Sequence, residues 1–244
     1  MKSSKKFHFK TKTKLKSAKL LEVYKTLRKS FGHQDWWPGE TPFEVIVGAI
    51  LTQNTSWTNV EKAIWNLKKS NKLTPEAMLE TENSVLAELI RPAGYFNVKT
   101  ERLKSFLQFL FNEYDGKLSL MFREPGETLR KKLLGVKGIG PETCDSILLY
   151  AAEKPFFVID AYTKRIFSRH GLISSGKKYL SSSTLKSKTI PFSEYETWQK
   201  MFRDSLPNDV RLYNDFHAQI VQVGKEFCRP QKVFCESCPL KLYL

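Results

Sequence analysis

The most constraining feature of the sequence is a helical spacing of apolar residues that recurs from Leu20 almost to the end of the chain. Apolar residues repeat at i, i+3, i+4 and i+7 in segments such as Val60–Leu67, Leu103–Phe111 and Tyr213–Val223. Only Pro155–Ile159 favours a strand, and so short a segment cannot make a sheet alone. The spacing therefore predicts an all-α fold with short polar connections.

The charge of the chain is strongly basic and unevenly distributed. Forty lysines and arginines against 25 acidic residues give a net charge of +15. Residues 1–19 contain eight lysines and no acidic residue, and subtracting those eight charges leaves +7 for the rest. A basic body with a basic arm favours a polyanionic partner, nucleic acid ahead of an anionic membrane. Residues 1–17 lack hydrophobic periodicity, so we expect a flexible basic arm that either binds nucleic acid or only aids solubility.

Several classes of protein are disfavoured. The longest apolar stretch with helical character, Val45–Leu51, is far shorter than the ~20 residues of a membrane span. The lysine-rich start contains no apolar segment of the kind found in a secretory signal. Four cysteines, three of them in the last 17 residues, do not make an extracellular disulfide scaffold. We therefore expect a cytoplasmic, nucleoid-associated protein with no membrane partner.

The most informative motif is Gly138-Ile139-Gly140, which lies between two predicted helices, the second beginning at Pro141. Two glycines around one aliphatic residue let backbone N–H groups approach an anion closely, and the second helix adds the positive end of its dipole. We predict that Gly138, Gly140 and Lys137 bind the phosphate backbone of a nucleic acid without reading its sequence. An ordinary helix–helix corner with glycine caps is the alternative.

This hairpin, together with the segment Val158–Thr163, resembles the endonuclease III superfamily of base-excision DNA glycosylases. The interval of 22 residues from Gly138 to Asp160 also fits, and the resemblance covers about residues 20–243. It implies an all-α enzyme with two helical subdomains flanking a DNA-binding cleft, a helix-hairpin-helix and a C-terminal Cys-rich loop. It also implies that Asp160 is the catalytic carboxylate.

Asp160 follows the apolar residues Phe156–Ile159 and precedes a helical pattern. Aspartate is a favoured N-cap, so a purely structural role is the simple interpretation. The two roles are compatible, because capping would fix the direction of a carboxylate from which apolar neighbours exclude water. Such a group could stabilise an oxocarbenium-like sugar and orient an attacking water.

Bifunctional members of the superfamily use a lysine just after the hairpin to form a Schiff base with the sugar. The matching position here is Glu142, and a carboxylate cannot form an imine. Lys137 precedes the turn and is expected to face the DNA backbone. We therefore predict a monofunctional glycosylase. The alternatives are an endonuclease III-like glycosylase/lyase for oxidised pyrimidines and a non-catalytic helix-hairpin-helix DNA-binding protein.

Two aromatic segments, residues 35–38 and 51–57, resemble the branch of the superfamily called 3-methyladenine DNA glycosylase III. A glycosylase must extrude its target nucleotide, and an indole ring attracts a cationic base. We therefore expect a flipped base to be held between flat side chains, although aromatic residues of helical proteins more often belong to the core. The resemblance implies a base pocket lined by Trp37, Pro38 and Trp57. It also implies that Asn54 fills the gap left by the flipped base.

The predicted C-terminal helix carries two further candidates. In the same branch a lysine on this helix lies near the catalytic aspartate, and Lys225 occupies the matching place. His217 is either a contact to a DNA phosphate or a buried histidine, and we expect the second.

Cys228, Cys235 and Cys238 are spaced like three ligands of a metal or cluster site. Endonuclease III relatives bind a 4Fe–4S cluster with the spacing Cys-x6-Cys-x2-Cys-x5-Cys, and the fourth position here is Leu244. Three outcomes stay open: a cluster with an outside ligand, a zinc ion held by three thiolates and another ligand, or an empty site.

We expect residues 18–40 and 135–244 to form one helical subdomain, with the terminal helices and the cysteine loop. Residues 41–134 are expected to form the central helical subdomain that leads into the hairpin. The predicted function is hydrolysis of the N-glycosidic bond of alkylated purines, chiefly 3-methyladenine. The predicted partner is double-stranded DNA containing damaged bases, bound by a monomer.

Overall fold

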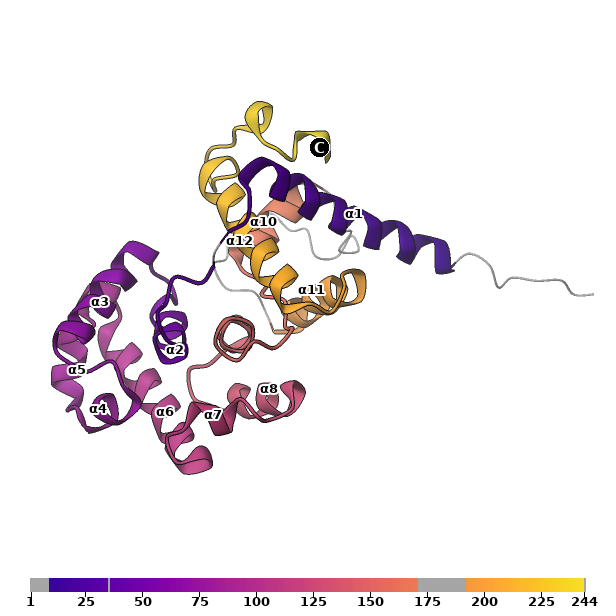
Figure 1. Ribbon diagram of the computed structural model, residues 1–244. Coiled ribbons are helices and arrows are strands. Elements are labelled where there is room, and N and C mark those ends of the chain that lie inside the picture. Colours follow the sequence, from indigo (N-terminus) through magenta and orange to yellow (C-terminus); the bar gives the residue numbers. More distant parts are fainter. Residues whose placement is uncertain (1–8, 35, 171–191, 244) are drawn as a thin grey trace, which may run out of the picture. The chain divides into compact units, whose positions relative to one another are not determined.

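The computed structural model describes residues 9–34, 36–170 and 192–243, with side chains from residue 19 onward. The all-α prediction is confirmed over these residues, which contain no strand and one isolated β-bridge between Cys228 and Val233. Figure 1 shows the helices joined by short connections. The α-helices are α1 (Phe9–Phe31), α2 (Pro42–Leu51), α3 (Trp57–Lys69), α4 (Pro75–Glu80), α5 (Asn83–Leu89), α6 (Phe96–Tyr114), α7 (Leu118–Met121), α8 (Gly126–Leu134), α9 (Pro141–Ser146), α10 (Ala161–Arg169), α11 (Phe192–Ser205) and α12 (Val210–Glu226).

Four shorter helices complete the described part of the chain. A π-helix, η2 (Ile147–Ala151), directly continues α9. The other three are 3-10 helices, η1 (Arg91–Ala93), η3 (Cys235–Ser237) and η4 (Lys241–Tyr243). Because η1 contains Pro92, a longer helix is disfavoured there, and Gly94 with φ +68 ends the segment.

The described chain divides into two compact units, one of which spans residues 37–155. Its central helix is α2, whose residues Phe43–Leu51 are all buried, as expected for a helix that is apolar on every face. Helices α3, α6, α9 and η2 pack against it. The start of α2 is capped by a side chain: the Oγ1 of Thr41 accepts a hydrogen bond from the N–H of Glu44 at 3.2 Å.

The other unit combines the start of the chain, up to Trp36, with the segment from Phe156 onward. Helix α1 packs against α11 and α12, and α10 packs against α12. Buried aromatic rings fill the space between these helices; Phe157 and Phe202 stack with their ring centroids 4.3 Å apart. The unit therefore unites two segments distant in sequence through one apolar core.

This division differs from the expected boundaries in two respects. Residues 37–40 and 135–155, which the sequence analysis joined to the terminal subdomain, belong to the unit of the central helices, where α9 and η2 pack on α2. Residues 9–17, expected within a flexible arm, are helical in α1. Lysine is a good helix former, and this segment extends a helix that is packed from Leu20 onward. The rest of the predicted arm, residues 1–8, lies outside the described residues.

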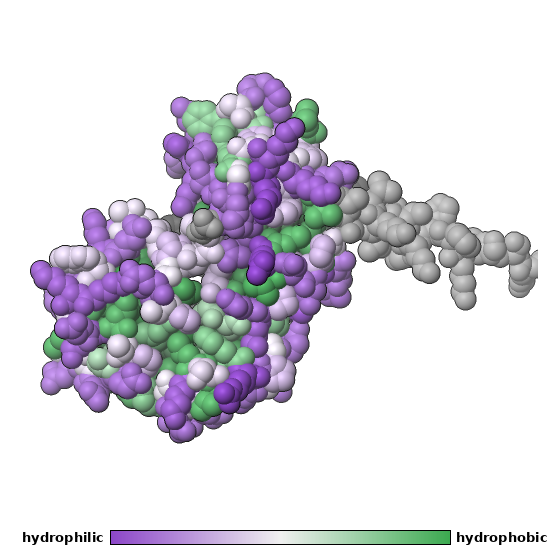
Figure 2. Space-filling view, viewed as in Figure 1, coloured by the Kyte–Doolittle hydropathy of each residue, from purple (hydrophilic) through white to green (hydrophobic). Residues whose placement is uncertain are grey.

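The surface combines charged side chains with separated apolar patches. Figure 2 shows one face, on which apolar side chains gather in patches on the unit that contains α2 to α8. Large apolar side chains exposed on this unit are Trp65, Val85, Tyr95 and Val98. No helix among the described residues is both long and apolar enough to cross a membrane.

Candidate functional site

The predicted hairpin is present between α8 and α9. Helix α8 has its C-cap at Gly135, and α9 starts with Pro141 directly after its N-cap Gly140. Gly138 has φ +89, a left-handed conformation that favours glycine. Ile139 is buried and anchors the turn, whereas Gly140 is exposed. The turn thus presents accessible backbone on one side and an apolar anchor on the other.

A buried ion pair joins the two helices of the hairpin. The guanidinium of Arg130 in α8 donates from Nε to Oδ1 of Asp145 at 2.7 Å and from Nη2 to Oδ2 at 3.2 Å. Asp145 is fully buried and Arg130 nearly so. A two-point pair of this kind fixes orientation as well as distance. The sequence analysis did not identify this ion pair, although an arginine and an aspartate on the two helices of a predicted hairpin could have indicated it.

Two side chains predicted to contact DNA are exposed on the same unit. Lys137 precedes the hairpin turn, and its Nζ lies 3.2 Å from Oε2 of Glu101, which is also exposed. Exposed ion pairs of this type are weak, so a phosphate can replace the carboxylate. Asn54 lies in the connection between α2 and α3, is exposed and has φ +58, which asparagine tolerates better than most residues.

An aromatic cluster lies on α2 in this unit. The rings of Trp37 and Trp57 meet edge to face with centroids 5.2 Å apart, and Tyr150 of η2 lies 5.0 Å from Trp37. A Cβ added to Gly48 would come within 3.3 Å of Trp37 and 3.4 Å of Trp57, so the small residue makes room for both indoles. Pro38 follows Trp37 and is exposed.

This arrangement corrects one expectation. Direct edge-to-face contact between Trp37 and Trp57 leaves no slot, so a base cannot be held between these two indoles as they stand. Both rings and Tyr150 are only partly buried, and they offer an aromatic surface instead. Tyr150 was missed because the predicted helix was interpreted through its apolar face, to which a half-exposed tyrosine does not belong.

In the other unit, Asp160 is the N-cap of α10, as predicted. Its Oδ1 accepts hydrogen bonds from the backbone N–H of Thr163 at 2.7 Å and from the Oγ1 of Thr163 at 2.8 Å. Its Oδ2 lies 3.5 Å from Nε2 of His217 in α12. The apolar residues Phe156–Ile159 before it are all buried, so the carboxylate is directed by the cap and shielded from water.

Electrostatics keeps this carboxylate ionised. Burial alone would raise the pKa of Asp160, but the imidazole of His217 and the two donors of Thr163 outweigh it and hold the pKa below its usual range. Burial and then the negative charge of Asp160 raise the pKa of Tyr162, whose ring packs on Gly224.

The two candidates on α12 have different surroundings. His217 is buried, as expected, and its Nε2 lies 3.5 Å from Oδ2 of Asp160. Lys225 is exposed near the end of the helix, with Nζ 5.5 Å from the ring centroid of Trp36. Among the described residues, the contacts of Asp160 are with Thr163 and His217 and do not include Lys225. The sequence analysis expected Lys225 to lie near Asp160, whereas in the structure the residue of α12 in contact with Asp160 is His217.

The three cysteines near the C-terminus do not form a ligand set in the described part of the chain. Cys228 and Cys238 are buried and Cys235 is half-buried, all as free thiols. The Sγ of Cys228 accepts from the guanidinium of Arg169 at 3.2 Å. No group of three or more His, Cys, Asp or Glu side chains suited to a metal occurs among the described residues. The candidate fourth position, Leu244, lies outside them.

Comparisons with known proteins converge on one family. The pattern of the HhH-GPD superfamily base excision DNA repair protein matches residues 47–190. A Methanocaldococcus jannaschii protein named "Putative DNA repair glycosylase" is 45% identical over 91% of this chain and 94% of its own length. Endonuclease III of Thermotoga maritima is 28% identical over 82% of this chain and 81% of its own.

Solved structures are similar over most of the chain. The crystal structure of H. pylori 3-methyladenine DNA glycosylase (MagIII) bound to 1,N6-ethenoadenine has a TM-score of 0.67 and 28% identity, and covers 86% of this chain and 97% of that one. A non-covalent endonuclease III–DNA complex has a TM-score of 0.73 at 19% identity, covering 93% and 94%, and supports the fold alone.

Proposed function

The chain belongs to the HhH-GPD superfamily of base excision DNA repair proteins, and we propose that it removes alkylated purines, chiefly 3-methyladenine, by hydrolysis without cutting the strand. Its membership of the endonuclease III superfamily, with a MagIII-like relationship, agrees with the hairpin and the aspartate segment. The chain is thus a DNA glycosylase by family. The lesion and the absence of lyase chemistry are the proposed part.

The observation that carries the proposal is the state of Asp160. The carboxylate is buried, its pKa is lowered, and two hydrogen bonds direct one oxygen, while the second oxygen lies 3.5 Å from Nε2 of His217. A carboxylate with one oxygen held by two donors and the other beside an imidazole suits charge stabilisation during glycosidic cleavage.

The proposed reaction follows from that arrangement. The bond between C1′ and the purine nitrogen breaks, its electron pair leaves with the base, and Asp160 stabilises the positive charge that develops on the sugar. A water molecule then attacks C1′, and its proton passes to the Asp160 carboxylate. A base that is already cationic leaves as a neutral molecule, so no general acid is needed for it.

Two features support the absence of lyase activity and the choice of lesion. Glu142, exposed in the first turn of α9, stands where bifunctional relatives have a lysine, and it cannot form an imine. The aromatic surface of Trp37, Trp57 and Tyr150 favours a flat cationic base, since π-faces attract positive charge. The H. pylori relative bound an adenine derivative.

The test is product analysis with methylated duplex DNA. We expect free 3-methyladenine and an abasic strand that stays intact, and no covalent adduct when borohydride is added. A borohydride-trapped adduct or a nicked strand would favour the glycosylase/lyase alternative, most clearly on DNA with oxidised pyrimidines. DNA binding with no release of any base would favour the non-catalytic alternative.

The proposed activity includes no step through a metal cluster. Among the described residues, Cys228 accepts from Arg169, and no group of three or more side chains suited to a metal occurs. The cluster stays a prediction from spacing, with zinc and an empty site as alternatives. Iron and zinc analysis of the purified protein tests all three.

A further inference from the structure

Gln53, in the connection between α2 and α3, uses its whole side-chain amide to contact distant segments of its own unit. Its Nε2 donates to the backbone carbonyl of Gly138 at 3.0 Å and to Oγ1 of Thr143 at 2.8 Å. Its Oε1 accepts from the guanidinium of Arg102. One side chain thus joins the α2–α3 connection to both sides of the hairpin turn and to α6.

Arg102 makes this junction tight. A Cβ added to Gly138 would lie only 2.3 Å from Cγ of Arg102, so the arginine stem lies directly against the hairpin backbone. Because Gly138 also has φ +89, this position requires glycine for both conformation and space. Gln53, Arg102 and the hairpin therefore interlock, and a shift of one element must displace the others.

The residues directly before Gln53 are fixed as well. The ammonium of Lys99 in α6 is almost completely buried and donates to the carbonyls of Leu51 and Ala93, both at 2.7 Å. Burial, with a smaller effect from Arg102, lowers the pKa of Lys99 to about 8. Thr52 adds a bond from Oγ1 to the carbonyl of Gly48 at 2.6 Å. The exposed Asn54 therefore directly follows a segment, Leu51–Gln53, that hydrogen bonds hold in place.

We propose that Gln53 is a positioning residue that sets the distance between Asn54 and the hairpin. Asn54 then enters the duplex at a fixed distance from the phosphate that the hairpin binds. This inference rests on the proposed function, because it assumes that both elements contact DNA. The distance is set within one unit, and the Gln53 side chain is not needed to touch DNA itself. Its loss should impair base extrusion far more than DNA binding.

The test replaces Gln53 by leucine, which keeps much of the volume and removes all three hydrogen bonds. We expect single-turnover release of 3-methyladenine to fall by up to about 100-fold, since misplacement by ~1 Å away from the chemistry has an effect of that order. The dissociation constant for duplex DNA should change by less than about threefold, because phosphate contacts supply most of the affinity. Gln53→Glu keeps the acceptor for Arg102 and should restore part of the rate.

Gln108→Leu is the matched control, since Gln108 is an exposed glutamine on α6 of the same unit. It should change neither quantity. Retention of base release within about twofold in Gln53→Leu would overturn the proposal. So would an equal loss of binding and release together with a large drop in melting temperature, because that pattern indicates a purely structural role.

A second readout separates this inference from the proposed function. Duplex DNA with an abasic-site analogue and a neighbouring 2-aminopurine reports opening of the helix without any base release. Fluorescence should rise with the unmodified protein and with Gln108→Leu, and much less with Gln53→Leu. That result supports the inference even if the unmodified protein releases no alkylated base, which would refute the proposed function. No rise with the unmodified protein would overturn the inference.

Discussion

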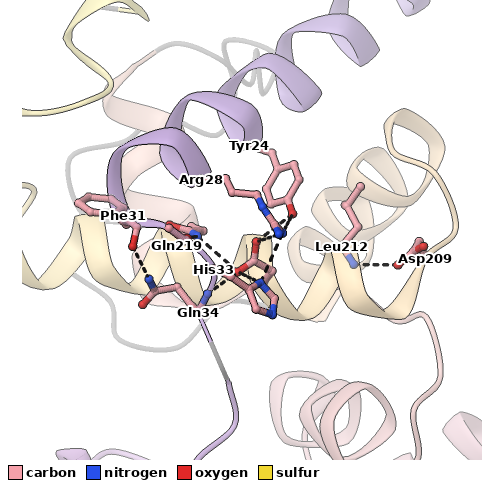
Figure 3. A network of polar contacts seen from close by, with 10 residues as sticks. Tyr24, Arg28, Phe31, His33, Gln34, Asp209, Leu212 and Gln219 are labelled. Atoms are coloured by element: carbon pink, nitrogen blue, oxygen red, sulfur yellow. Dashed lines mark hydrogen bonds and ion pairs between the residues drawn. The ribbon is translucent and has the colours of Figure 1, made fainter.

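Two buried aspartates of the same unit, Asp160 and Asp215, are surrounded in different ways. Asp215 in α12 accepts from the hydroxyl of Tyr24 and the backbone N–H of Gln34, both at 2.8 Å, and from Arg28 at 3.0 Å. Figure 3 shows these donors converging from the end of α1 and the segment after it. Asp160 has two donors on Oδ1, both from Thr163, and its Oδ2 lies 3.5 Å from Nε2 of His217.

On the proposed function, this difference separates a structural carboxylate from a catalytic one. Each oxygen of Asp215 has fixed donors, and His33 adds a contact of 3.0 Å from Nδ1, so the group ties the end of α1 to α12. Saturated oxygens cannot accept a proton or orient a water. Asp160 instead has one oxygen whose neighbour is an imidazole at 3.5 Å. Burial is common to both carboxylates, so the proposed catalytic role of Asp160 rests on the different surroundings of its second oxygen.

The largest expected effect is the loss of base release in Asp160→Asn. Asparagine keeps the N-cap but has no negative charge to stabilise the sugar cation or accept a proton, so the single-turnover rate should fall by about 10²- to 10⁴-fold. Affinity for methylated duplex DNA and the melting temperature should change little. Asp209→Asn, at the N-cap of α12, is the matched control and should retain full activity. If Asp160→Asn released 3-methyladenine at a near-normal rate, Asp160 would have no catalytic role to distinguish it from Asp215.

The next effect concerns stability. Asp215→Asn removes the charge that pairs with Arg28 and leaves buried donors poorly satisfied, so the free energy of unfolding should fall by about 3 kcal/mol. For a chain of this size that corresponds to a melting temperature lower by roughly 6–12 °C in thermal unfolding. Activity per folded molecule should stay the same at a temperature where the variant is folded. A rate loss comparable to that of Asp160→Asn would assign Asp215 to the reaction.

The pH profile distinguishes the two carboxylates further. His217 lowers the pKa of Asp160 against the effect of burial, so His217→Gln should raise that pKa. Because the reaction needs the ionised carboxylate, activity is present above the pKa of Asp160 and is lost as pH falls through it. The acidic limb of kcat/KM should therefore move to higher pH in His217→Gln. His33→Gln, which alters the neighbour of Asp215 instead, should leave that limb in place, and an equal shift in both variants would contradict the assignment.

The sequence predicted the elements better than their contacts. The hairpin and the N-cap role of Asp160 depend on local patterns, in which spacing and residue type determine the outcome. The neighbour of Asp160 could not be predicted in the same way. His217 and Lys225 are both on α12, about two helical turns apart, and only the packing of α10 on α12 determines which one faces the aspartate.

The aromatic site shows the same limit. Trp37 and Trp57 were identified by type, but their edge-to-face contact depends on the space that Gly48 leaves on α2. Gln53 has no chemical signature in the sequence, because its partners Gly138 and Thr143 are 85 and 90 residues away. Contacts across such separations are determined by tertiary packing, which a single sequence does not display.

The smallest expected effects come from removing one hydroxyl beside each carboxylate. Thr163→Val removes the Oγ1 donor from Asp160 and keeps the backbone N–H, so the pKa of Asp160 should rise and the rate at acidic pH should fall by severalfold, with little effect at alkaline pH. Tyr24→Phe removes one donor from Asp215 and should lower the free energy of unfolding by about 1 kcal/mol without changing the pH profile. Parallel pH–rate and thermal unfolding measurements on both variants test this. If Thr163→Val lost stability but kept its pH profile, Asp160 would act only as the N-cap of α10. The proposed catalytic role of its carboxylate would then be contradicted.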